Sequence, residues 1–148
     1  MNQNLSSTDK AYLAGLLDGD GSIYVRAKPN STYRYGFQIA SYIVFFQSSK
    51  NKKDFAKIFS SLDLGIMRER KDGILEYTIN RKDSIAILLE YIKPFLILKK
   101  KQANLLEIIL ERKERVENQK DFQKLLNLVD TFRNLNYSKK RKRHTLTP

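Results

Sequence analysis

The spacing of apolar residues near the start of the chain changes from a helical period to a strand period. Around residues 8–19, apolar side chains recur every three or four positions, and the Ser, Thr and Asp residues just before them can cap a helix. After Gly21, apolar and polar residues alternate as far as Pro29, which is the period of a half-buried strand. The pattern therefore predicts a helix over about 8–19, a strand that ends at Pro29, and a second strand over about 35–47.

The same two periods recur in the rest of the chain. Alternating segments at 66–70 and 74–80 flank Lys71-Asp72-Gly73, and an Asp-Gly pair between such segments is a good signal for a hairpin. An apolar stripe at helical spacing predicts a helix between the two pairs of strands, and its members are Phe55, Ile58, Phe59 and Leu62. Further helical patterns cover 85–92, which ends before Pro94, then 99–117 and 121–136.

These elements follow one another in the order αββαββα, with further helices at the end, which predicts an α+β fold. An antiparallel sheet of this kind carries helices on one face and leaves the other face free. A chain of 148 residues can close one hydrophobic core. We therefore expect one domain over 1–137 and a basic tail over 138–148. Three phenylalanines are expected in the core, namely Phe55, Phe59 and Phe95.

The net charge of the chain limits the classes of molecule that it is expected to bind. Lys and Arg number 28 against 16 Asp and Glu, and the formal net charge of +12 favours a polyanion such as nucleic acid. The longest apolar stretch, 39–46, is too short to span a bilayer, so we expect no membrane partner. The absence of cysteine excludes disulfides, thiolate zinc sites and a cysteine nucleophile. No targeting pattern precedes the first helix, which suggests synthesis in the compartment of use, either an organelle (chloroplast or mitochondrion) or a prokaryotic cytoplasm.

Small residues and carboxylates combine at the end of the first predicted helix. Gly15 and Gly19 lie four positions apart on one helical face, so a second copy of this helix could approach backbone to backbone. Asp18 and Asp20 fall at the C-terminal end, where the helix dipole disfavours negative charge, so a cation must compensate. Carboxylate oxygens suit Mg²⁺. We expect a symmetric homodimer that forms through Leu13, Gly15, Leu16 and Gly19.

The run Leu13-Ala14-Gly15-Leu16-Leu17-Asp18-Gly19-Asp20-Gly21 resembles the nine-residue LAGLIDADG signature, and the helix-strand-strand order after it is similar to that family's arrangement. The resemblance continues through Gln38, Gln47, Arg68 and Arg70 to residues 99–104. It points to the single-motif, homodimeric, intron-encoded type of LAGLIDADG homing endonuclease. What it implies is a saddle-shaped antiparallel sheet that binds double-stranded DNA, and metal-dependent cleavage at a long pseudo-palindromic site that promotes intron mobility.

The resemblance also implies roles for individual residues. Asp20 would be the catalytic carboxylate that binds Mg²⁺, and Gly19 would add a backbone carbonyl to the metal site. Gln47 and Lys99 would order water and charge as further catalytic residues. Asp18 would cap and stabilise the helix pair.

One position departs from the family pattern. The family has a basic active-site residue four positions past the glutamine, and that position is Asn51 in this chain. Lys50, Lys52 and Lys53 lie beside it and are the candidates to replace the missing positive charge.

The exposed face of the predicted sheet is strongly basic. A twisted antiparallel sheet has a shape that can follow the major groove, so we expect this face to bind DNA. The DNA-binding residues predicted on the strands and their connections are Tyr24, Arg26, Lys28, Asn30, Tyr33, Gln38, Arg68, Arg70, Glu76 and Thr78. In the basic tail, Lys139, Lys140, Arg141 and Lys142 are expected to contact phosphates, and a localisation signal is the alternative interpretation of this tail.

The sequence is also compatible with two other functions. An RNA maturase that assists splicing of its own intron could use the same basic surfaces to bind structured RNA. A DNA-binding regulator could share the fold without cutting. Asp20 favours a nuclease over such a regulator, but it does not separate a nuclease from a maturase. His144, the one histidine of the sequence, has no second ligand near it in the tail, so we expect no metal or catalytic role for it.

Overall fold

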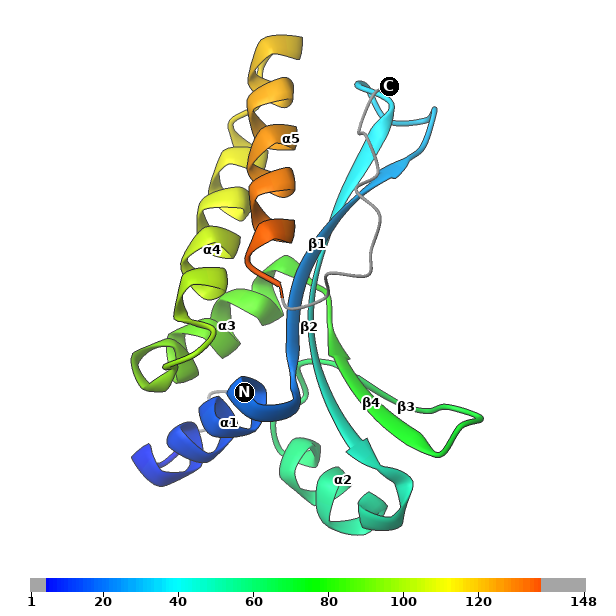
Figure 1. The fold of residues 1–148 in the computed structure, drawn as a ribbon, viewed down its shortest axis with the longest axis vertical. Coiled ribbons are helices and arrows are strands. Elements are labelled where there is room, and N and C mark those ends of the chain that lie inside the picture. Colours follow the sequence, from blue (N-terminus) through cyan, green and yellow to red (C-terminus); the bar gives the residue numbers. More distant parts are fainter. Residues whose placement is uncertain (1–4, 137–148) are drawn as a thin grey trace. The chain divides into compact units, whose positions relative to one another are not determined.

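The computed structural model describes residues 5–136 and places helices and strands in the predicted order (Figure 1). The helices are α1 (Ser7–Asp20), α2 (Lys52–Ser60), α3 (Lys82–Ile92), α4 (Lys100–Glu114) and α5 (Gln119–Asn134). The strands are β1 (Ser22–Pro29), β2 (Phe37–Ser48), β3 (Ile66–Glu69) and β4 (Ile74–Ile79). Two 3₁₀ turns are η1 (Ser49–Asn51) and η2 (Lys93–Phe95). The predicted α+β fold is therefore confirmed, and the predicted ends agree to within about one helical turn.

The structure bears differently on the expected basic tail and on the expectation about membranes. The basic tail over 138–148, with its four predicted phosphate contacts and His144, lies outside the described residues. Within residues 5–136, none of the helices has the length and apolarity that crossing a membrane requires.

The four strands form one sheet in the order β1-β2-β4-β3. Strand β4 pairs antiparallel with both of its neighbours, and Tyr77 lies opposite Phe45 of β2 and Met67 of β3. Along β4, Leu75, Tyr77 and Ile79 are buried while the residues between them are partly exposed. This is the alternation that the period of two predicts, and it gives the strand one apolar and one polar face.

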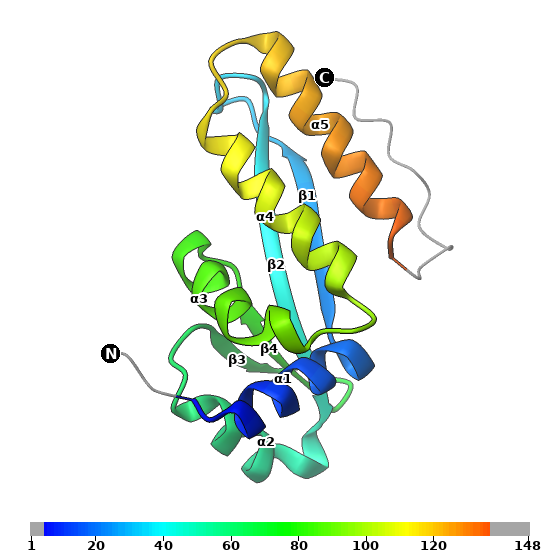
Figure 2. The same ribbon diagram turned by 90° about the vertical axis from the view of Figure 1, so that its left-hand side faces the viewer.

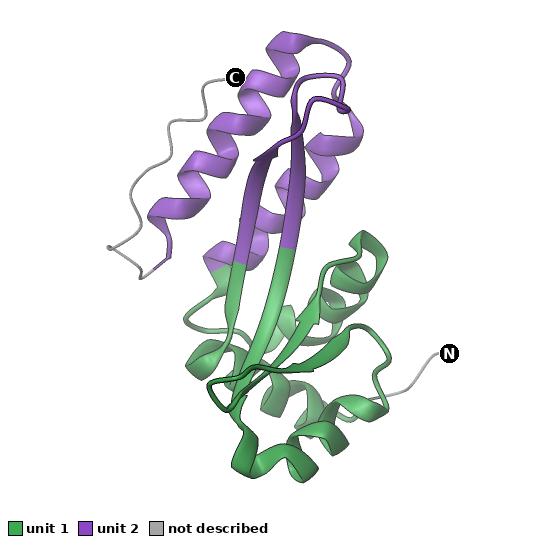
Figure 3. Ribbon diagram, turned by 90° about the vertical axis from the view of Figure 1, so that its right-hand side faces the viewer, with its two compact units in different colours: residues 1–23, 42–100 green, residues 24–41, 101–148 purple. Residues whose placement is uncertain are grey.

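The chain divides into two compact units that are interleaved in sequence (Figure 3). Of the described residues, unit 1 comprises 5–23 and 42–100, and unit 2 comprises 24–41 and 101–136. Strands β1 and β2 each contribute residues to both units.

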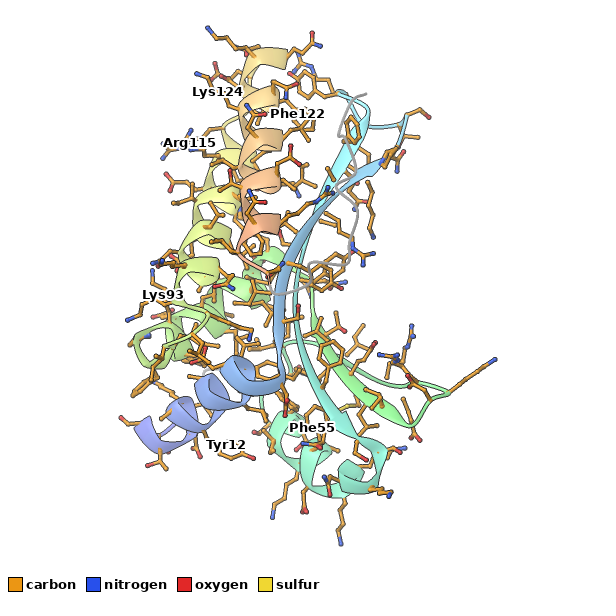
Figure 4. All side chains as sticks on the ribbon, in the orientation of Figure 1. Tyr12, Phe55, Lys93, Arg115, Phe122 and Lys124 are labelled. Carbon is orange, nitrogen blue, oxygen red and sulfur yellow. The ribbon has the colours of Figure 1, made fainter. Side chains whose placement is uncertain are left out.

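The core of unit 1 contains a cluster of aromatic rings. Phe59 of α2 lies 4.2 Å from the Tyr77 ring in a stacked arrangement and 4.9 Å from the Phe45 ring. Phe55, which Figure 4 labels on α2, meets Phe59 edge to face at 4.9 Å. Both side chains are buried. The expectation that these two phenylalanines lie in the core is confirmed. Because aromatic side chains bury large apolar areas, this cluster fixes α2 on the inner side of β2 and β4.

Unit 2 is built around the helix pair α4 and α5, which lie side by side in Figures 1 and 2. Phe122 of α5 stacks on the Tyr35 ring at 4.9 Å (Figure 4). On α4, the Lys113 ammonium donates a hydrogen bond of 2.9 Å to the carbonyl oxygen of Ile39 in β2. The Gln102 amide donates to the Leu135 carbonyl at 2.9 Å and joins the two helices.

The hairpin between β3 and β4 turns at the predicted Asp-Gly pair. Gly73 has a φ of +82°, a conformation that residues with a Cβ rarely adopt. The Ile74 amide donates to the Asp72 side chain at 3.2 Å, and the Arg70 amide donates to the Ile74 carbonyl at 2.8 Å. The local hydrogen bonds therefore agree with the hairpin read from the sequence.

Of the three phenylalanines predicted to lie in the core, Phe95 is the one whose side chain is not buried. Its side chain is 37% exposed, whereas the next residue, Leu96, is 2% exposed. The reason is the 3₁₀ turn η2, which has about three residues per turn and shifts the phase of the apolar stripe that α3 began. Leu96 therefore points inward instead of Phe95.

The segment before β3 is held by one tyrosine hydroxyl. The Tyr77 oxygen accepts hydrogen bonds from the Leu64 amide at 3.1 Å and the Gly65 amide at 2.7 Å. The pKa of Tyr77 lies above its usual value because the hydroxyl is buried, although these two amides favour the charged form. The hydroxyl thus sets where β3 begins.

We predict that Tyr77→Phe lowers the free energy of unfolding by about 1–3 kcal/mol, because two partly buried amides lose their acceptor. The measurement is urea unfolding at one protein concentration. Tyr33→Phe, which removes an exposed hydroxyl, serves as the control and should change the free energy little. Equal stability of the two variants would contradict the role given to the Tyr77 hydroxyl.

Candidate functional site

Helix α1 carries the candidate site at its C-terminal end, and local contacts fix both of its ends. At the start, Ser6 and Asp9 form a capping box, in which each side chain accepts a hydrogen bond from the other residue's amide. At the end, the Gly21 amide donates to the Leu17 carbonyl at 3.0 Å. A Cβ at Gly21 would lie 2.3 Å from the Leu17 side chain, so glycine is needed for the chain to leave the helix here.

Asp18 is bound by the backbone of the segment before α4. Its carboxylate accepts hydrogen bonds from the amides of Ile97 at 2.8 Å, Leu98 at 3.2 Å and Lys99 at 3.0 Å. Three amide donors occupy most of the accepting capacity of this carboxylate, so Asp18 has a structural role within unit 1.

Lys99 returns this contact. Its ammonium donates a hydrogen bond of 2.9 Å to the Asp18 carbonyl oxygen, which is one of the unpaired carbonyls at the end of α1. The residue is 7% exposed. Burial lowers the pKa of Lys99 below its usual value, and the nearby Asp18 and Asp20 carboxylates oppose this shift. A positive charge is thus held beside the end of the helix.

Asp20 differs from Asp18 in its surroundings. It is exposed, and its carboxylate makes no hydrogen bond or ion pair with the residues that the structure describes. Gly19 is exposed beside it. An unpaired carboxylate and a helix-end carbonyl are hard oxygen donors that fit Mg²⁺.

The described residues of one chain do not gather a large set of side-chain metal ligands. Between residues 5 and 136, no group of three or more His, Cys, Asp or Glu side chains could hold a metal ion. Mg²⁺ in enzymes is commonly held by only one or two carboxylates, together with water and substrate phosphates. The donors at Gly19 and Asp20 therefore fit half of a site that needs further ligands.

Gln47, at the end of β2, is held by two donors. Its side-chain oxygen accepts from the Ser48 amide at 2.9 Å and from the Asn51 side-chain amide at 3.2 Å. Asn51 stands at the N-cap of α2 but makes no capping hydrogen bond with its side chain. These contacts leave the amide nitrogen of Gln47 as the group that can donate to a ligand.

The lysines around Asn51 are not equivalent. The Lys52 ammonium pairs with the Glu69 carboxylate at 2.9 Å, whereas Lys50 and Lys53 are exposed. The hydrogen bond between Asn51 and Gln47 and this ion pair were not foreseen from the sequence, because neither residue pair forms part of a recognisable pattern.

In unit 1, the predicted DNA-binding residues lie on the polar face of the β3–β4 hairpin. Arg68 is opposite Glu76 in the register, with 3.9 Å between the guanidinium and the carboxylate. Arg70 contacts the same carboxylate at 3.4 Å and also pairs with Asp72. Thr78, two residues beyond Glu76, shares the face. The arginine side chains are therefore held by neighbouring carboxylates.

In unit 2, the predicted residues lie on β1, on β2 and in the loop between them. Arg26 and Lys28 are exposed and Gln38 is partly exposed, while the Arg26 guanidinium lies 5.2 Å from the ring centre of Tyr24. In the loop, the Asn30 side-chain oxygen accepts from the Thr32 amide at 3.0 Å and from its hydroxyl at 2.6 Å. Tyr33, in the same loop, is 42% exposed.

The residues expected at a dimer interface differ in exposure. A Cβ added at Gly15 or Gly19 would meet nothing within 4 Å among the described residues, so no contact with that part of the chain requires glycine there. Leu16 is partly exposed, but Leu13 is 3% exposed and packs into the core of unit 1.

Three exposed apolar residues near this helix were missed by the sequence reasoning. They are Tyr12 on α1, which Figure 4 labels, and Ile97 and Leu98 in the segment that binds Asp18, with exposures of 57%, 81% and 60%. The consecutive apolar pair at 97–98, directly before the charged start of α4, is the signal that could have found them.

Comparison with known proteins identifies the family. The family model described as LAGLIDADG endonuclease matches residues 13–111. The DNA endonuclease I-CreI of Chlamydomonas reinhardtii is 32% identical over 143 residues, which cover 96% of this chain and 87% of that protein. The DNA endonuclease I-CvuI of Chlorella vulgaris is 32% identical over 111 residues, which cover 75% of this chain and 67% of that protein.

The fold agrees with these relatives. A crystal structure of I-CvuI in complex with its target superposes with a TM-score of 0.84 at 28% identity, over 92% of this chain and 87% of that one. The archaeal intron-encoded homing endonuclease I-Vdi141I, complexed with DNA, shares the fold with a TM-score of 0.79 at 19% identity, over 93% of this chain and 89% of that one. The motif at the end of α1, the arrangement of the strands and both sequence relatives agree, and the chain belongs to the LAGLIDADG endonuclease family.

Proposed function

We propose that this chain is a site-specific double-strand DNA endonuclease that cuts a long pseudo-palindromic site as a homodimer and promotes the mobility of its own intron. The observation that supports this most directly is the exposed, unpaired carboxylate of Asp20 near the buried ammonium of Lys99. Among the relatives, I-CvuI was crystallised with its DNA target in the presence of Ca and with the I-CreI target in the presence of Mg.

The surface of α1 supports the proposal of a homodimer. One motif supplies one half of a paired site, and Gly15 and Gly19 pack against nothing in residues 5–136 that would exclude a side chain. Tyr12, Ile97 and Leu98 add exposed apolar side chains, which a second copy of the chain could bury. An isologous two-fold contact through Gly15 and Gly19 would bring two Asp20 carboxylates near the axis.

The proposed chemistry divides between three side chains. Asp20, with the Gly19 carbonyl, would hold Mg²⁺, and a metal bound there would supply activation of water and stabilisation of the leaving oxygen. Lys99 would place positive charge near the phosphate that is cut. Gln47 would donate from its amide nitrogen to water or to a phosphate oxygen, because its oxygen is already taken by Ser48 and Asn51.

The polar strand faces of both units would contact DNA. Arg68 and Arg70 suit bidentate hydrogen bonds to guanine, and Gln38 suits adenine. Exposed cations such as Arg26 and Lys28, together with the basic tail, would neutralise phosphates and make binding depend on salt. The location in an organelle or a prokaryotic cytoplasm, and the single domain over 1–137, stay predictions.

The dimer leads to a prediction about Gly15. Gly15→Leu should leave the chain folded, because a Cβ at this position meets none of the described residues, but it should keep two copies of α1 apart and split the dimer. Sedimentation velocity measures this. Ala86→Leu, which adds a comparable side chain at an exposed position of α3, is the control and should stay dimeric. An unaltered dimer after Gly15→Leu would count against the proposed interface.

A second prediction concerns Asp20. Asp20→Asn keeps the size of the side chain but removes the charge that would bind the metal, so the variant should fold and bind DNA without cutting it. A randomised duplex library with Mg²⁺ supplies the cleaved site, which then serves for gel-shift and nicking assays on one preparation. Asp130→Asn, at an exposed position of α5, removes the same charge and should cut normally. Near-normal cutting by Asp20→Asn would refute the metal site, and loss of folding would make Asp20 structural.

The third prediction concerns the pH dependence that Lys99 gives to stability. Because burial lowers the pKa of Lys99 when the chain is folded, the folded chain releases this proton at a lower pH than the unfolded chain. Stability contributed by Lys99 is therefore lowest near neutral pH and rises as the pH approaches the usual lysine pKa of 10.5.

Lys99→Met should remove that rise, which urea unfolding from about pH 8 to about pH 10 would measure. Tyr77 has a raised pKa and acts in the opposite direction, but it is present in both proteins and cancels in their difference. Lys53→Met, at an exposed lysine, is the control and should follow the parent profile. Parallel profiles for Lys99→Met and the parent would show that Lys99 is not desolvated.

A further inference from the structure

Ile66, the first residue of β3, is an apolar residue on an otherwise polar face. The register places it opposite Thr78, and it places Arg68, two residues later, opposite Glu76. Because alternate residues of a strand point to the same face, Ile66 lies beside the predicted DNA-binding residues and not on the core side. Its side chain is 72% exposed, so it contributes little to the packing of the chain.

The position of Ile66 is fixed by its neighbours. The Tyr77 hydroxyl binds the amides of the two residues before it, as described above. A Cβ at Gly65 would lie 2.3 Å from the carbonyl oxygen of Thr78, so the backbone at Gly65 approaches β4 closely. These contacts fix the register in which β3 begins to pair with β4. The backbone of Ile66 therefore has a fixed position on the same face as Arg68.

Single exposed apolar residues are common on protein surfaces and by themselves need no explanation. Ile66 is distinguished by its surroundings. It shares the face of β3 with Arg68, whose side chain is 72% exposed and lies opposite Glu76. A face that binds the major groove meets mostly hydrogen-bonding groups on the base edges. The one apolar group there is the C5-methyl of thymine.

We propose that Ile66 is a specificity-determining residue that reads a thymine through contact with its 5-methyl group. The methyl group of Thr78, opposite it, completes a small apolar surface for that contact. The inference rests on the proposed function, because it requires that the polar face of the hairpin bind duplex DNA. It adds a base preference that the charged residues of the face cannot supply, since hydrogen-bonding side chains do not detect a methyl group.

The probe is a randomised duplex library made in two forms, one with thymidine and one with deoxyuridine in its place. The two forms offer the same hydrogen-bonding groups and differ by the methyl group alone. Binding selections are run with the dimeric parent protein, with Ile66→Val and with Ile66→Ser. Ile87→Ser, which changes an exposed isoleucine of α3, is the matched control.

The parent, Ile66→Val and Ile87→Ser should select thymine at one position of each half-site. Their affinity for the selected site should fall about fourfold for each half-site when deoxyuridine replaces that thymine, which corresponds to the loss of one buried methyl group. Ile66→Ser should bind the thymine and deoxyuridine forms of that site equally well.

Three results would overturn the proposal. One is an equal affinity of the parent for the two forms at every selected position. Another is a methyl preference that persists in Ile66→Ser, and a third is a loss of affinity in Ile66→Ser that is the same for all sequences. If neither library yields a bound site with the parent, the proposed function itself fails, and the methyl contact fails with it.

Discussion

Two residues that bind each other hold the end of helix α1. The Asp18 carboxylate accepts hydrogen bonds from three consecutive amides before α4. The Lys99 ammonium, from the same segment, donates a hydrogen bond to the Asp18 carbonyl oxygen. A buried ammonium without a partner would be costly, and so would a carboxylate at the negative end of a helix. Each residue removes the penalty of the other, so the contact is more than a surface ion pair.

This contact separates the roles of two carboxylates that lie two positions apart. Asp18 is surrounded by amide donors, whereas Asp20 has no partner among the described residues. The difference does not come from the residues themselves, which are identical, but from the segment 97–99 that reaches only one of them. Any change that moves this segment would alter the charge around Asp20 without touching it.

Most elements of the fold could be predicted because local patterns mark them. The Asp-Gly turn, the aromatic stripe of α2 and the alternation in β4 are local signals, and they were read correctly. The motif also lies on α1 as expected, whereas the roles given to Asp20 and to the glycines of this helix stay predictions. Phe95 was misplaced because the 3₁₀ turn η2 changes the helical phase. Pro94 marks the end of α3, but it does not indicate which of the apolar residues after it points inward.

The details of the site depend on contacts between distant positions, which no local pattern contains. Nothing near Asp18 in the sequence indicates that residues 97–99 bind it. The same holds for Lys113, which binds the Ile39 carbonyl. The pairing of Arg70 with Glu76 also depends on the register of two strands. On the hairpin, Arg70 is held by both Asp72 and Glu76, which reduces the side-chain entropy that binding would otherwise remove.

The interleaving of the two units has a consequence for how the chain can be made and altered. The sequence crosses from one unit to the other after residues 23, 41 and 100, so neither unit is a continuous segment. During synthesis, unit 1 cannot be completed before residue 100 emerges, although its motif helix is made first. A chimaera that exchanges one unit between two relatives must replace two separate stretches of sequence, with junctions within β1, within β2 and at the start of α4. Recombination at a single point between residues 23 and 100 would instead divide at least one unit between the two parents, and no single crossover can exchange one whole unit for another.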